Sequence, residues 1–207
     1  MSDSEKFEWT WKDRIHNYTK ETGYPNALFI EDGCQNSLFL AADSRVVGTW
    51  ILGNNYQVKS EYYGGYPNTY LKRIKALFPD KKKTLHLFSG KVDTEVFPGD
   101  TVDINPDNNA TYVDDAQTLL NVPLEEYDLV LADPPYSVED CDHYKTTMVK
   151  RNVVLRALQR LPPGSHVVWL DQCLPMWRKE FFSLEAVIGV VRSSNHRFCV
   201  ITIFRRL

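Results

Sequence analysis

The chain has 207 residues, of which 43% are hydrophobic, 13% aromatic and 25% charged. This composition is typical of a packed soluble protein and excludes a disordered, collagen-like or coiled-coil chain. Its 24 basic and 27 acidic residues give a formal net charge of −3. Because the protein has no bulk positive field, contact with DNA or RNA would need a local basic patch or a shaped pocket.

The spacing of the cysteines indicates whether a metal site is expected, and the length of the apolar runs indicates whether the chain could cross a membrane. The four cysteines show neither a CxxC spacing nor a histidine at metal-ligand spacing, so we expect reduced thiols and no metal site. The charged segment 1–11 differs from a signal peptide, and the longest nearly apolar stretch, 45–52, is too short to span a bilayer. We therefore expect a cytoplasmic protein that does not bind a membrane.

The first part of the chain, residues 1–60, is expected to form a small N-terminal lobe of irregular or β structure. Asp32-Gly33 is typical of a hairpin turn between two of its strands. Short apolar runs predict strands in this lobe at residues 27–30, 38–40 and 46–52.

The second part, residues 61–207, begins with a predicted helix over 69–78, where apolar side chains recur at helical spacing. Asn68 is its candidate cap, and Pro79 ends it. A further helix is predicted over 148–161. Near-continuous apolar runs predict an α/β fold with a mainly parallel sheet that is covered on both faces and ends in an antiparallel hairpin. These runs lie at residues 84–88, 101–104, 111–113, 127–132, 166–170, 186–191 and 198–204.

One motif stands where a ligand site is expected. The apolar strand ends at Ala132 and leads directly into Asp133-Pro134-Pro135-Tyr136, and ligands of open α/β sheets bind at the carboxyl ends of strands. The two prolines stiffen the backbone, Asp133 adds an acceptor, and Tyr136 adds a ring that can stack on a base. This set suits an exocyclic amine on a planar heterocycle, held by Asp133 and the Pro134 carbonyl. A stiff turn without function is the alternative that the motif alone leaves open.

Further residues lie in a characteristic order around this motif. They are Gly64-Gly65-Tyr66-Pro67 before the first helix of the second part, Leu85-His86-Leu87-Phe88-Ser89-Gly90 at the first strand, Asp103 at the end of the second, and Asp114-Asp115-Ala116 after the third. With the DPPY motif, this order resembles the class I S-adenosylmethionine-dependent methyltransferases, specifically the amino-methyltransferases of nucleic acids. The resemblance covers residues 62–204. It implies a Rossmann-like fold with a seven-stranded, mainly parallel sheet.

The resemblance also implies a role for each matching residue. The catalytic residues would be Asp133, Pro134, Pro135 and Tyr136. Contacts with the cofactor, S-adenosylmethionine, would come from Tyr63, Gly64, Gly65, Phe88, Ser89, Gly90, Asp103, Asp115, Ala116 and Asp133. The first cofactor motif departs from the family pattern, because His86 stands near an acidic position and Val92 replaces a glycine. A side chain at Val92 would crowd the turn where the backbone approaches the cofactor.

The loop between the last two strands is a second candidate for substrate contact. It lies at the same edge of the predicted sheet as Asp133 and offers groups suited to phosphates and base edges. With Tyr136, the expected substrate contacts are Arg192, Asn195, His196 and Arg197. A solvated hairpin turn is the plainer interpretation of this loop.

The resemblance predicts methyl transfer to an exocyclic amine of a nucleobase, with adenine N6 in DNA favoured over RNA. The alternatives are adenine N6 or guanine N2 in RNA, and relatives with another first motif residue act on cytosine N4 or a glutamine amide. A cofactor-binding module without catalysis is the alternative from another class. Because the chain has no long insertion for target recognition, specificity is expected to be low or supplied by a protein partner.

Overall fold

The computed structural model describes residues 8–23, 37–52, 66–67, 69–144, 146–192 and 198–207. The predicted strand at 27–30, the Asp32-Gly33 turn and the candidate cap Asn68 lie outside these residues. Among the described residues, no helix combines the length and the apolar character needed to cross a bilayer.

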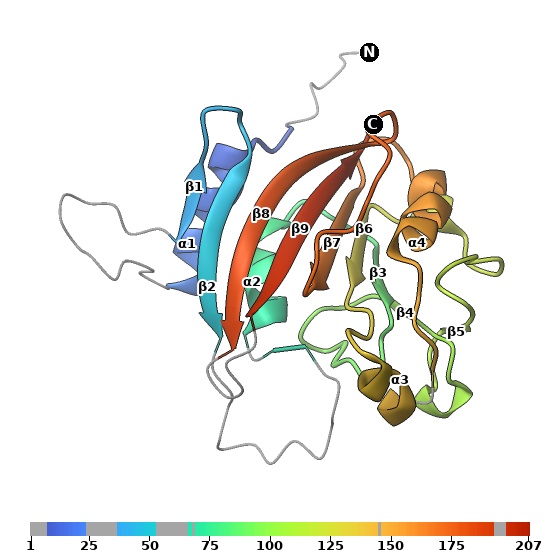
Figure 1. The fold of residues 1–207 in the computed structure, drawn as a ribbon. Helices are drawn as coiled ribbons and strands as arrows, with labels where there is room; N and C mark the ends of the chain where they lie inside the picture. Colours follow the sequence, from blue (N-terminus) through green and yellow to red (C-terminus); the bar gives the residue numbers. More distant parts are fainter. Residues whose placement is uncertain (1–7, 24–36, 53–65, 68, 145, 193–197) are drawn as a thin grey trace.

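Nine strands form one mixed sheet in the order β1-β2-β8-β9-β7-β6-β3-β4-β5 (Figure 1). Five of the eight strand pairings are parallel, and β9 is antiparallel to both of its neighbours. The strands are β1 (Leu38–Leu40), β2 (Val46–Leu52), β3 (Thr84–Leu87), β4 (Asp100–Asp103), β5 (Tyr112–Val113), β6 (Leu129–Ala132), β7 (His166–Asp171), β8 (Phe182–Arg192) and β9 (Phe198–Arg206).

The predicted count of seven strands is therefore wrong. The seven predicted strands of the second part are β3 to β9, and the closing hairpin is antiparallel as expected. The two additional strands come from the first part of the chain, because β2 pairs in parallel with β8 from Val46 opposite Ala186 to Leu52 opposite Arg192. Figure 1 shows β1 and β2 beside β8, at one edge of the sheet.

The helices differ from the predicted ones in number and length. The predicted helix over 148–161 is shorter, because the backbone at Lys150 is extended and its N–H donates to Gln117 Oε1, 3.0 Å away. The sequence patterns also missed α1 and α3. The α-helices are α1 (Trp11–Thr22), α2 (Tyr70–Leu77), α3 (Val138–Tyr144) and α4 (Arg151–Ala157), and the 3-10 helices are Pro106–Asn108, Leu124–Glu126 and Leu158–Arg160.

Side chains of the strands alternate between two hydrophobic clusters. Leu131 and Val168 belong to the first cluster, whereas their neighbours Val130 and Val167 belong to the second. Because successive side chains of a strand point to opposite faces, the clusters lie on opposite faces of the sheet. Residues of α1 and α2 complete the first cluster and residues of α4 complete the second, so helices cover both faces.

The N-terminal segment is held on the first face by a buried aromatic stack. The rings of Tyr18 in α1 and Trp50 in β2 are stacked with their centroids 5.6 Å apart, and neither side chain is exposed. Arg73 of α2 lies over the Trp50 ring, and its Nη1 donates to the Tyr18 hydroxyl at 2.8 Å. A buried guanidinium over an aromatic face replaces lost hydration with cation–π and hydrogen-bond interactions. This cluster therefore fixes α1, α2 and β2 to one another.

His166, the first residue of β7, takes part in contacts that join α1 to β7 and β8. Its Nε2 lies 3.1 Å from Glu185 Oε2, and Trp11 Nε1 donates to the same oxygen at 2.9 Å. Its ring packs on Phe78, with the centroids 5.0 Å apart. Burial lowers the pKa of His166 to about 4, so the imidazole is neutral at pH 7. The ionised Glu185 accepts from Nε2, which places the proton of the neutral ring there.

We expect the free energy of unfolding to decrease as the pH is lowered from about 6.5 to about 4. The pKa of His166 is lower in the folded than in the unfolded state, so the unfolded chain binds more protons in this window. The contribution of His166 to the free energy of unfolding is complete above pH 6.5. Its loss between pH 6.5 and pH 4 amounts to about 3 kcal/mol. The variant His166→Gln should remove this part of the slope in urea unfolding measured at several pH values.

The matched control is His16→Gln, because His16 is exposed on α1. This variant should keep the part of the slope that His166→Gln removes. The part due to His86, whose pKa burial also lowers to about 4, should persist in both variants. A pH slope that is the same in His166→Gln as in the parent protein would contradict the assignment.

Candidate active site

Parallel pairing places the carboxyl ends of β3, β4, β5 and β6 at one edge of the sheet. Leu87 is opposite Val102 on one side and Ala132 on the other, so the three strands end at nearly the same level. The segments that follow them contain predicted site residues: Phe88, Ser89, Gly90, Asp103, Asp115, Ala116, Asp133, Pro134, Pro135 and Tyr136. The sheet thus brings together the part of the predicted site that the structure describes.

The turn after β3 has an unusual backbone. Phe88 and Gly90 have positive φ angles of 57° and 50°, the left-handed region that disfavours a residue with a Cβ. Such strain at Phe88 is of the order of 1 kcal/mol and is common at functional turns. The Ser89 N–H donates to Val102 O at 3.1 Å, which ties the turn to β4. The Ser89 hydroxyl is buried and has no hydrogen-bond partner among the described residues.

Three carboxylates, one at the end of β4 and two after β5, organise the adjacent loops. Asp103 accepts from Gly90 N–H through Oδ2 and from Asn105 N–H through Oδ1, both at 2.8 Å. Asp114 also accepts a backbone N–H on each oxygen, whereas Asp115 accepts from Gln117 N–H at 2.8 Å through Oδ1. Asp103 therefore connects the turn after β3 to the end of β4.

The DPPY segment ends β6 and begins the turn into α3. The Tyr136 hydroxyl donates a short hydrogen bond to Asp133 Oδ1. The N–H groups of Tyr136 and Ser137 both donate to Asp140 Oδ2, at 3.2 and 3.1 Å, which fixes the backbone after the prolines. Burial raises the pKa of Tyr136 well above its usual value, and the charge of Asp133 adds to this. The phenol is therefore a neutral donor that covers the carboxylate.

Two further tyrosines lie on the same face of the sheet as this segment. The rings of Tyr66 and Tyr70 are stacked with their centroids 4.9 Å apart, and the Tyr66 ring is 6.2 Å from that of His86. Burial and the charge of Asp133 raise the pKa of both phenols. Tyr66 belongs to the quoted Gly64–Pro67 motif but was not among the predicted contacts, and only its place in that motif could have indicated it.

The acidic position of the first cofactor motif holds a buried histidine instead. His86 Nε2 is 3.0 Å from the carbonyl oxygen of Phe97, and burial lowers the pKa of His86 to about 4. The neutral ring therefore donates from Nε2 and holds the loop before β4. Val92 closes the turn that follows β3, where its N–H donates to Ser89 O at 3.0 Å. Its side chain packs against the first hydrophobic cluster. His86 and Val92 thus have structural partners at this turn.

Asp171, at the end of β7, forms a buried ion pair at the same edge. Arg151, the first residue of α4, donates to its two oxygens at 2.6 and 3.1 Å. Trp169 Nε1 and Gln172 N–H donate to the same carboxylate at 3.0 and 2.7 Å. Asp171 is fully buried, so this network fixes the start of α4 beside the DPPY segment. Sequence patterns show Asp171 only as one more acid at a strand end.

Several predicted contacts cannot be placed. Arg192 is the last residue of β8, but its side chain is not described. The remaining ones lie outside the described residues: Tyr63, Gly64, Gly65, Asn195, His196 and Arg197. Within the described ranges, no group of three or more His, Cys, Asp or Glu side chains could hold a metal ion.

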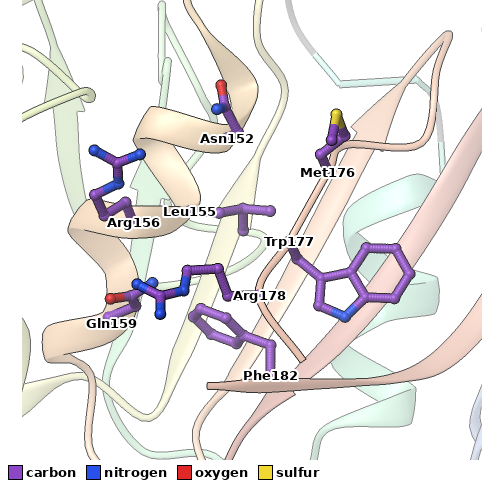
Figure 2. A pocket seen from close by; sticks show the side chains of 8 residues that line it. All are labelled: Asn152, Leu155, Arg156, Gln159, Met176, Trp177, Arg178 and Phe182. Carbon is purple, nitrogen blue, oxygen red and sulfur yellow. The ribbon is translucent and has the colours of Figure 1, made fainter. Parts of the chain in front are cut away.

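A pocket elsewhere on the molecule contains none of the predicted site residues (Figure 2). It lies between α4 and the segment that leads from β7 into β8, where Leu155, Trp177 and Phe182 form its apolar wall. Arg156 and Arg178 add charge at its rim. The complete lining is Asn152, Leu155, Arg156, Gln159, Met176, Trp177, Arg178 and Phe182.

No protein-family model matches the sequence, and no curated protein is significantly similar to it. Among solved structures, the N-methyltransferase NodS from Bradyrhizobium japonicum, in complex with S-adenosyl-L-homocysteine, is similar with a TM-score of 0.48 at 16% identity, over 67% of this chain and 84% of NodS. The Streptococcus mutans protein SMU.1697c, in complex with the same compound, has a TM-score of 0.40 at 14% identity, over 62% and 88%. These values establish neither a family nor a function for this chain.

We expect Asp171→Asn to lower the free energy of unfolding by about 3 kcal/mol. It leaves the Arg151 guanidinium without its counter-charge and points an amide N–H₂ toward other donors, and breaking a buried ion pair from one side costs about that much. The control is Asp43→Asn, which breaks the exposed pair with Arg45 and should change the free energy of unfolding far less, because solvent screens this pair. Equal losses in urea unfolding of the two variants would show that Asp171 is not an anchor.

Proposed function

We propose that this protein transfers a methyl group from S-adenosylmethionine to an exocyclic amine of a nucleobase, with N6 of adenine in DNA as the favoured target. The observation that carries the proposal is the DPPY segment at the end of β6. It presents a carboxylate, Asp133, and the ring and neutral hydroxyl of Tyr136 at the carboxyl end of a strand that has parallel neighbours on both sides. Ligands of α/β proteins bind at such strand ends.

The donor and acceptor groups after β3, β4 and β5 suit this cofactor. Each oxygen of Asp103 has accepted one backbone N–H and retains a further lone pair for a ribose hydroxyl. Asp115 could accept from the adenine amine, and the buried Ser89 hydroxyl, which lacks a described partner, could bind the amino-acid end. When bound, S-adenosylmethionine supplies an electrophilic methyl group on a sulfonium centre.

The residues of this chain would orient and polarise the amine. Asp133 accepts an N–H of the amine, and the Pro134 carbonyl accepts the other. Both bonds would move the nitrogen toward tetrahedral geometry and expose its lone pair. As the nitrogen gains the methyl group, the electron pair of the broken C–S bond would stay with S-adenosylhomocysteine, and Asp133 would accept the proton that the amine loses. The Tyr136 hydroxyl already donates to Asp133 Oδ1, which leaves this oxygen one lone pair for the amine and makes it a weaker acceptor. The Tyr136 ring would stack on the base.

Recognition of the target would depend on residues outside the DPPY segment. A target in duplex DNA would have to be flipped into the site, and Arg192, Asn195, His196 and Arg197 are the proposed contacts to phosphates and base edges. A protein partner could supply sequence recognition. RNA as the substrate, with adenine N6 or guanine N2 as the target, and a cofactor-binding module without catalysis remain the alternatives.

Removal of the Asp133 carboxylate should abolish methyl transfer. Purified protein would be incubated with labelled S-adenosylmethionine and separate pools of unmethylated DNA and RNA, and the labelled nucleoside identified after digestion. We expect N6-methyladenine from the DNA pool, and at least about 100-fold less of it with Asp133→Ala. Asp43→Asn, at an exposed hairpin, should retain full activity.

The other outcomes of this assay separate the alternatives. Label in the RNA pool would replace DNA by RNA, and transfer undiminished in Asp133→Ala would contradict the mechanism. Folded protein that neither transfers label nor binds the cofactor would favour the module without catalysis.

The two parts of Tyr136 should be separable by substitution. Tyr136→Phe keeps the ring and removes the hydroxyl that weakens Asp133 as an acceptor, so kcat/KM should be equal to that of the parent protein or higher. Tyr136→Ala removes the stacking platform, which is worth about 1–3 kcal/mol per base, so kcat/KM should fall about 10- to 100-fold. Equal losses in both variants would show that the hydroxyl, not the ring, matters.

A further inference from the structure

Two buried hydroxyl groups beside the DPPY segment have no role in the mechanism above. The Oη atoms of Tyr66 and Tyr70 are buried without a hydrogen-bond partner among the residues that the structure describes. Most buried polar side-chain atoms in proteins have a hydrogen-bond partner, because burying a hydroxyl without one costs about 1–3 kcal/mol of folding free energy. Two such groups in stacked neighbouring rings therefore need a physical explanation.

The sheet places Tyr66 next to Asp133. The Tyr66 ring lies 6.2 Å from the ring of His86, which is opposite Leu131 in the adjacent strand β6. Leu131 and Asp133 are two residues apart, so both side chains point to the same face of the sheet. Tyr66 and Tyr136 both pack against the hydrophobic cluster of that face.

Electrostatics agree with this placement. The charge of Asp133 contributes, after burial, to the raised pKa of both Tyr66 and Tyr70. Both phenols are therefore neutral and can donate. The site thus contains an acceptor, Asp133, and close to it a donor that has no described acceptor.

We propose that the Tyr66 hydroxyl donates a hydrogen bond to an unprotonated ring nitrogen beside the target amine, with Tyr70 as the positioning residue behind it. The inference rests on the proposed function and narrows its substrate class. Adenine and cytosine both carry their exocyclic amine next to a ring nitrogen that accepts a hydrogen bond. In guanine, the two nitrogens beside the amine are N1, which carries a proton and would oppose the Tyr66 donor, and N3, which accepts. Guanine would therefore fit only with N3 toward Tyr66.

The two tyrosines differ in what they can reach. The hydroxyls of both are buried, but the charge of Asp133 is the largest cause after burial of the raised pKa of Tyr66, whereas for Tyr70 it comes after the effect of Tyr66. Tyr66 is thus the nearer of the two to Asp133. The near-parallel stack, with an angle of 17° between the rings, restricts the orientation of Tyr66. Tyr66 is therefore the ligand contact, and Tyr70 acts through the ring of Tyr66.

The test compares adenosine with 1-deazaadenosine, in which a carbon replaces the ring nitrogen beside the amine. Binding would be measured by calorimetry with S-adenosylhomocysteine at saturation, so that the nucleoside does not enter the cofactor site. We expect the parent protein to bind adenosine about 10-fold more tightly, which corresponds to one hydrogen bond of about 1.4 kcal/mol. Tyr66→Phe should bind both nucleosides equally.

Control variants separate the hydroxyl from the fold. The hydroxyl of Tyr66 has no described partner to lose, so Tyr66→Phe should unfold at a urea concentration no lower than the parent protein. Tyr70→Phe keeps the stacked ring and should keep the discrimination, whereas Tyr70→Leu should weaken it. Tyr112→Phe removes a hydroxyl on β5, which accepts from Tyr127, and should change nothing in nucleoside binding.

Each outcome decides between the inference and its alternatives. Discrimination that persists in Tyr66→Phe, or that is absent from the parent protein, overturns the inference. Loss of S-adenosylhomocysteine affinity in Tyr66→Phe also overturns it, because the hydroxyl would then contact the cofactor. Discrimination that depends on Tyr66 without methyl transfer to DNA or RNA would support this site but contradict the proposed function. If the protein methylates DNA and Tyr66→Phe still prefers adenosine to 1-deazaadenosine, the proposed function would be supported and the role of Tyr66 contradicted.

Discussion

Parallel pairing on both sides of β6 is the constraint on which the candidate site depends. β3 and β7 both run parallel to β6, and Ala132 is opposite Leu87 on one side and Trp169 on the other. Three chain segments therefore reach the same edge side by side: Phe88 follows β3, Asp133 follows β6, and Asp171 is the last residue of β7. Each segment is then fixed by its own backbone contacts. The chemistry at this edge thus requires only that short apolar strands pair in register.

Local sequence patterns predict those parts of the fold that depend on a single strand or a single turn. The runs that form β3 to β9 are apolar and bounded by polar turns, so their existence and the site motif at the end of β6 could be recognised. The pairing of β2 with β8 could not, because it joins segments about 140 residues apart and no local pattern encodes it. α1 was missed although Thr10 and Asp13 form a capping box, because most of its side chains are polar.

The same difference applies to the site residues. Asp133 and Tyr136 are recognisable because they are adjacent in the sequence and follow a strand. The pairing of Asp171 with Arg151 depends on the approach of α4 to β7, and the contact of Tyr66 with His86 depends on the approach of a loop to β3. Such contacts between distant segments determine which of several similar acids and tyrosines has a special environment.

The attachment of α1 to the last strands has a consequence for synthesis of the protein. Trp11 donates to Glu185, and Glu8 pairs with Arg205, so the first described helix makes contacts with residues more than 170 positions later. Contacts of such separation form slowly, since a long loop must close before they contribute. During translation, β2 cannot pair with β8 until about 140 further residues have been synthesised. The edge of β2 that pairs with β8 is unpaired until then, and unpaired strand edges make an incomplete chain prone to aggregate.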